Sequence, residues 1–129
     1  MKITKKISCE KAFEKACNEL GLNPKDLPIV DSLPEKDQKS IIAYYKLTII
    51  IRALNEGWEA DFSNHNQWKY WVYVWVDSAG FVCANAATAA TDANAAFGSR
   101  LCFKDRETAQ FAIDNFMPLY EEYLLIPKK

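Results

Sequence analysis

The feature that most constrains the fold is a run of aromatic and β-branched residues from Trp68 to Val76, which follows a polar, turn-rich segment. Residues of these types favour β-strands, and the length of the run is typical of a single strand. Asp77-Ser78-Ala79-Gly80 has the composition of a hairpin turn, and Phe81-Val82-Cys83 begins the return strand. A third strand is expected at Arg100 to Phe103. The sequence therefore predicts a three-stranded antiparallel sheet.

Two helices are expected before the strands. Apolar residues recur at helical spacing between Cys9 and Leu20, where Ser8 is a suitable N-cap and Gly21 a C-terminal stop. Pro34 at the first helical position opens a second helix, which is expected to end near Asn55. The apolar residues of this second helix cover more than one stripe, which predicts a central helix covered on two sides.

Three other segments complete the chain. Leu22 to Leu33 carries two prolines and is expected to be an ordered connector. Ala84 to Phe97 mixes alanine, which favours helices, with threonine, asparagine and aspartate, which favour turns, so its conformation is left open. A last helix is expected from the N-cap Asp105 to about Leu125, with a kink at Pro118 because proline removes a backbone hydrogen bond.

The segregation of helices from strands predicts one α+β domain over residues 1–129. The composition is that of a globular protein, with 50% hydrophobic and 26% charged residues. The net charge of −1 provides no global field that would attract nucleic acid. The basic N-terminus lacks the apolar segment of a signal peptide, and the apolar stretch Leu47–Leu54 is too short to cross a bilayer. We therefore expect a cytoplasmic protein without a membrane partner.

No motif in the sequence names a reaction. His65 is the only histidine, and its pairing with Cys83 or Cys102 as base and nucleophile has no support from their spacing. One histidine, scattered cysteines and no close carboxylate cluster do not make a four-ligand metal site. Phosphate-binding glycine loops are absent from a chain with four glycines. The sequence thus predicts no catalytic residues, metal or cofactor, with a thiol-dependent enzyme as the least favoured alternative.

One face of the aromatic strand is a candidate binding surface. Side chains alternate along a strand, so the valine face should pack on the helices and the opposite face carries three aromatic rings. Basic residues of this strand and of the expected third strand would surround the rings. The candidate binding residues are Lys69, Trp71, Tyr73, Trp75, Arg100 and Lys104.

Two functions and one structural alternative follow from this face. It could be an interface with a protein partner or a second copy of the chain, which is the favoured reading because aromatic surfaces are common in interfaces. It could instead stack the bases of single-stranded nucleic acid within a basic rim. Alternatively, the terminal helix or the segment 84–97 covers the rings, and the rings then contribute packing alone.

Two stretches resemble a known family. The segment from Leu33-Pro34-Glu35-Lys36 through Ile49 to Trp58 is one, and Gly98-Ser99-Arg100-Leu101-Cys102-Phe103-Lys104 with the helix that follows is the other. Together with the aromatic strand they resemble an uncharacterised family of small proteins encoded by phages, prophages and mobile elements of gut bacteria. The resemblance implies a phage or prophage accessory protein but no activity. The sequence therefore predicts a non-catalytic binding module.

Overall fold

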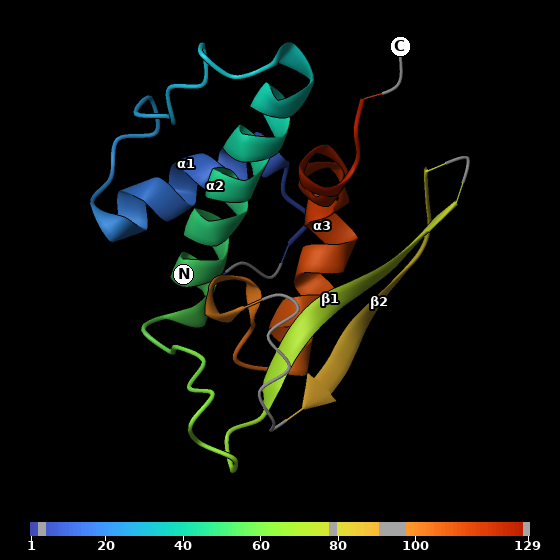
Figure 1. The fold of residues 1–129 in the computed structure, drawn as a ribbon. Coiled ribbons are helices and arrows are strands. Elements are labelled where there is room, and N and C mark those ends of the chain that lie inside the picture. Colours follow the sequence, from blue (N-terminus) through green and yellow to red (C-terminus); the bar gives the residue numbers. More distant parts are fainter. Residues whose placement is uncertain (3–4, 78–79, 91–97, 128–129) are drawn as a thin grey trace.

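The computed structural model describes residues 1–2, 5–77, 80–90 and 98–127, with the backbone alone for strand residues 75–77 and 80–90. Three helices pack together, and a long β-hairpin lies along the last of them (Figure 1). In chain order the elements are α1 (Cys9–Leu20), α2 (Glu35–Asn55), β1 (Lys69–Asp77), β2 (Gly80–Ala90), the 3-10 helix η1 (Ser99–Leu101) and α3 (Arg106–Leu124).

The helix ends follow the local signals in the sequence. Ser8 caps α1 by accepting a hydrogen bond from the backbone N–H of Lys11, and Gly21 ends the helix in the left-handed conformation with φ 71°. The first residue of α2 is Glu35, so Pro34 occupies the N-cap position rather than the first helical position. These two helices therefore begin and end within a residue of where the sequence predicts.

Helix α3 carries the predicted kink. Asp105 caps it by accepting a hydrogen bond from the backbone N–H of Thr108, and Phe116 inside the helix has non-helical angles of φ −119° and ψ 16°. Pro118 lies two positions further on, where its missing N–H and its ring disturb the preceding turn. The kink lets both halves of α3 keep their apolar residues on the core.

The predicted α+β class with a three-stranded sheet is wrong. The described residues are mainly helical, and their sheet contains β1 and β2 alone, paired antiparallel. Instead of a third strand, Ser99–Leu101 form the 3-10 helix, and Phe103 makes a single bridge to Tyr70 of β1. Leu101, Cys102 and Phe103 are all buried. Because Ser99–Leu101 turn as a 3-10 helix, Phe103 alone of the described residues in this segment pairs with β1, and the expected strand does not form.

The hairpin extends further than the sequence predicts. β2 continues through the alanine-rich segment to Ala90, which pairs with Lys69, and the register shifts between Trp71 and Val72 and between Trp75 and Val76. Residues 91–97 of the alanine-rich segment lie outside the described residues. The valine face packs on the helices as predicted, since Val72 is buried in the core and Val74 packs against it.

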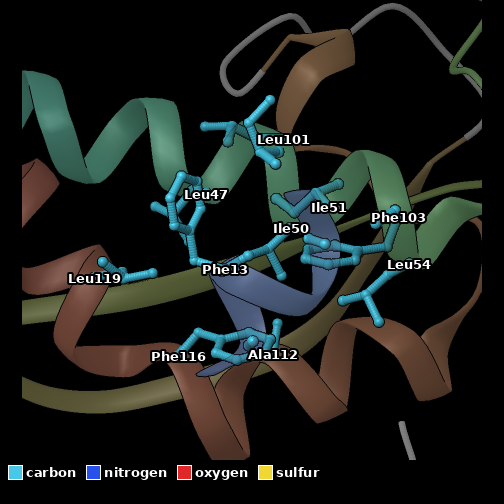
Figure 2. Packing of buried hydrophobic residues seen from close by; sticks show 14 of the residues in the cluster. Phe13, Leu47, Ile50, Ile51, Leu54, Leu101, Phe103, Ala112, Phe116 and Leu119 are labelled. Carbon is cyan, nitrogen blue, oxygen red and sulfur yellow. The ribbon is translucent and has the colours of Figure 1, made fainter. Parts of the chain in front are cut away.

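The core lies between the three helices and the hairpin. In Figure 2, Phe13 of α1, residues of α2 and α3, and Phe103 point toward a common centre. Helix α2 contacts α1, α3 and η1, but α3 contacts the other two helices and both strands, so α2 does not hold the predicted central position alone. The most deeply buried large apolar side chains are Leu47, Ile50, Ile51, Phe103 and Phe116.

Candidate binding groove on helix α2

Lys69, a predicted member of the binding face, is fully buried. Its Nζ donates hydrogen bonds to the backbone oxygens of Asn64, at 3.1 Å, and Gln67, at 2.9 Å, and lies 5.5 Å from the ring centroid of Phe62. These contacts all involve the polar segment that precedes β1. Lys69 therefore holds that segment against the strand and is not part of an accessible basic rim.

The three aromatic residues of the predicted face have different environments. Trp71 is 5% exposed and Tyr73 is 39% exposed. The side chain of Trp75 lies outside the described residues. Stacking of bases needs open ring faces in succession. The burial of Trp71 interrupts the series of rings on which the stacking hypothesis depends.

The two basic residues predicted on the third strand also lie apart from the sheet face. The Nζ of Lys104 is 2.8 Å from Oε1 of Glu56, and this hydrogen bond is the main cause that lowers the pKa of the Glu56 carboxyl. Arg100 is exposed on η1, beside α2. Because the third strand is absent, the six predicted residues do not share one face.

Cys102 does not have the properties of a nucleophile. It is buried, its Sγ donates a hydrogen bond to the backbone oxygen of Gly98 at 3.1 Å, and burial raises the pKa of the thiol to about 11. A reactive cysteine needs an accessible thiol with a lowered pKa. His65 is exposed in the segment before β1, and the side chain of Cys83 lies outside the described residues. Within the described part of the chain, no group of three or more His, Cys, Asp or Glu side chains could hold a metal ion.

A concave surface that the sequence did not predict lies along the outer side of α2. One part of it is a cavity of about 420 Å³ between α2, the connector and η1. Its apolar end is formed by the connector and the first half of the helix. The lining residues are Leu22, Pro28, Ile41, Tyr44, Tyr45, Thr48, Ile49, Arg52 and Arg100.

The second part is a more polar cavity of about 240 Å³ at the other end of α2. The residues that follow the helix and the 3-10 helix η1 form its walls. Its lining residues are Thr48, Ile51, Arg52, Asn55, Trp58, Glu59, Ala60, Ser99 and Arg100.

The two cavities adjoin along α2, since Thr48, Arg52 and Arg100 line both of them. On α2 the lining residues Ile41, Tyr45, Thr48, Arg52 and Asn55 follow one another at intervals of three or four positions, which places them on one stripe of the helix. At a rise of about 1.5 Å per residue, that stripe is about 21 Å long. We call this surface the α2 groove, with an apolar end at Ile41 and a cationic end at Arg52 and Arg100.

The connector forms the wall opposite α2 because local contacts hold it in place. The backbone N–H of Leu22 donates to the backbone oxygen of Cys17 at 2.8 Å, directly after α1. The side-chain oxygen of Asn23 accepts from the backbone N–H of Lys25 at 3.0 Å, and Val30 is buried. The groove is therefore formed between two ordered walls.

At the cationic end, the neutral polar side chains of Thr48 and Asn55 form hydrogen bonds with the protein backbone. Thr48 donates to the backbone oxygen of Tyr45 at 2.7 Å. The amide of Asn55 donates to the backbone oxygen of Cys102 and accepts from the backbone N–H of Lys104, at 2.9 and 3.0 Å. Arg52 and Arg100 are exposed and form no ion pair with any residue that the structure describes. The two guanidinium groups therefore remain available to a ligand.

Comparison with known proteins finds no match to a family model, a curated protein or a solved structure. The described helices include none that is long and apolar enough to cross a membrane. The predicted resemblance to a phage-encoded family stays a prediction.

Proposed function

We propose that the protein is a non-catalytic binding module that takes up an extended segment of a partner protein in the α2 groove. The observation that carries this proposal is the apolar end of the groove, where Leu22 and Ile41 are exposed beside Tyr44 and Tyr45. Exposed apolar side chains that line a concave surface are typical of sites that bind proteins. Tyrosine and arginine, which also line the groove, are enriched in protein interfaces.

The dimensions of the groove favour a peptide segment as the occupant. A stripe of about 21 Å accommodates about six residues in an extended conformation, at about 3.3 Å per residue. The groove also changes from apolar to cationic along its length, so an occupant with different side chains at its two ends would bind in one direction. This location replaces the sheet face, where Trp71 is buried, as the proposed interface.

Selection of peptides from a displayed random library on the immobilised full chain tests the proposal. We expect enriched peptides that carry a block of apolar residues, with binding measured by fluorescence anisotropy. Ile41→Asp places a charge at the apolar end of the groove and is expected to weaken binding at least tenfold. Ile126→Asp is the matched control because Ile126 is 72% exposed and is not among the residues lining the groove.

Three results would contradict the proposal. The first is an absence of apolar enrichment, and the second is an equal loss of binding in both variants. The third is tight, salt-sensitive binding of labelled single-stranded oligonucleotides that Tyr73→Ala abolishes and Ile41→Asp does not, which would favour the nucleic-acid alternative. Light scattering gives the mass in solution, and a dimer that Ile41→Asp dissociates would identify a second copy as the occupant.

A further inference from the structure

We infer that the cationic end of the α2 groove binds a carboxylate side chain of the partner segment, an assignment that rests on the proposed function. Arg52 and Arg100 come from different elements, α2 and η1, and line the same two cavities. A guanidinium group presents planar donors that match the two oxygens of a carboxylate. Two such groups without an ion-pair partner among the described residues provide the charge complement of an acidic side chain.

The lining of this end favours a singly charged ligand. Glu59 also lines the cavity, and no ion pair joins it to either arginine within the described part of the chain. Its negative charge would repel a phosphate, which carries a charge of about −1.5 to −2 at neutral pH, more strongly than a carboxylate. We therefore assign an aspartate or glutamate side chain to the site rather than a phosphorylated residue.

The spacing of the groove predicts where the acidic residue lies in the partner. Tyr45 belongs to the apolar end and Arg52 to the cationic end. The rise of the helix puts them about 10 Å apart along its axis, which is the span of about three residues of an extended peptide. The partner segment should accordingly carry an acidic residue about three positions from its apolar block.

The experiment compares peptide selection on three forms of the full chain. These forms are the wild type, the double variant Arg52→Ala/Arg100→Ala, and the control Lys11→Ala/Lys15→Ala. The control removes the same charge from two exposed residues of α1 that do not line the groove. Thermal unfolding of each form checks that it is folded. We expect the wild type and the control to enrich acidic residues near the apolar block, and the arginine double variant to enrich the apolar block alone.

Affinities of one enriched peptide then identify the charged group. Replacing its acidic residue by the neutral amide should weaken binding to the wild type about tenfold, equivalent to about 1.4 kcal/mol. The same replacement should leave binding to the arginine double variant unchanged. A peptide with phosphoserine at that position should bind the wild type more weakly than the carboxylate peptide.

The failures of the two proposals are distinguishable. Apolar enrichment without acidic enrichment on the wild type would refute the carboxylate site and leave the proposed function standing. Loss of acidic enrichment in the lysine control as well as in the arginine variant would also refute it, because the effect would then follow net charge. Tighter binding of the phosphoserine peptide would assign the site to phosphate. An absence of apolar enrichment on every form would refute the proposed function itself.

Discussion

Tyr120 lies near the C-terminal end of α3, with its hydroxyl buried and without a hydrogen-bond partner in the described structure. Protein mutational data put the cost of burying an unpaired hydroxyl at about 1–3 kcal/mol. Tyr120→Phe removes the hydroxyl and leaves a void the size of one oxygen atom, which costs a few tenths of a kcal/mol. We therefore expect this variant to be more stable than the wild type by about 1 kcal/mol, or about 4 °C in Tm for a chain of this size.

Urea unfolding followed by circular dichroism measures the difference, with Tyr44→Phe as the control because Tyr44 is only half-buried. The control should change stability by less than about 0.5 kcal/mol, as is usual away from buried polar groups. Destabilisation of Tyr120→Phe by 1 kcal/mol or more would refute the reasoning. That result would mean that the hydroxyl has a bonding partner in solution.

Tyr120 should also make the stability of the protein depend on pH under alkaline conditions. Burial raises the pKa of Tyr120 well above the ordinary value of about 10 for tyrosine. The folded state therefore holds this proton when the unfolded state has released it, so stability is fully present below about pH 10 and declines as the pH rises beyond it. Phe has no proton to lose. Above about pH 10, the free energy of unfolding should therefore fall less steeply with pH in Tyr120→Phe than in the wild type, by about 1.4 kcal/mol per pH unit.

Three further predictions concern the buried Lys69, the helix cap Asp105 and the buried thiol of Cys102. Lys69→Met should destabilise the protein by about 2 kcal/mol, because two backbone oxygens lose a charged donor, and limited proteolysis should show faster cleavage between residues 61 and 67. Asp105→Ala should lower the free energy of unfolding by about 1 kcal/mol in urea titrations through loss of the α3 cap, and an unchanged value would contradict that role. The thiol of Cys102, with a pKa of about 11, should react with a disulfide reagent at pH 8 only after unfolding, whereas rapid labelling of the native protein at this residue would show that it is accessible.

The helices could be predicted from the sequence because their signals are local. Ser8 and Asp105 precede apolar stripes, Gly21 ends one helix, and Pro118 lies within a continuous helical phase. Each of these residues acts on the backbone within one turn of itself. Such effects do not depend on the rest of the fold. Together with Pro34 before α2 and the helical spacing of the apolar residues, these signals predicted the positions of all three helices and the kink in α3.

The third strand and the basic rim could not be predicted because both depend on distant contacts. The alternation of Arg100 and Cys102 with Leu101 and Phe103 predicted a strand. In the fold Leu101, Cys102 and Phe103 are all buried, and Phe103 contacts Tyr70 and the core. Lys69 looks solvent-facing in the pattern of its strand. In the fold, the Nζ of Lys69 donates hydrogen bonds to two backbone oxygens of the preceding segment. Hydrogen bonds of this kind cannot be predicted from the alternation of residues along a strand.

The α2 groove did leave a signal in the sequence, in the form of more apolar surface than the helix needs for packing. Helices α1 and α3 cover the core side of α2, where the ring of Tyr45 contacts Phe13 and that of Tyr44 contacts Tyr123. Ile41 lies beyond those contacts and is exposed. The connector lies over that extra surface and leaves a cavity there, although closing it would bury more apolar area and stabilise the fold. Arg52 interrupts the apolar run where the groove turns cationic, opposite Arg100 from a segment far along the chain. The proposed partner segment would cover this exposed apolar surface and would pair with Arg52 and Arg100, which form no ion pair with any residue that the structure describes.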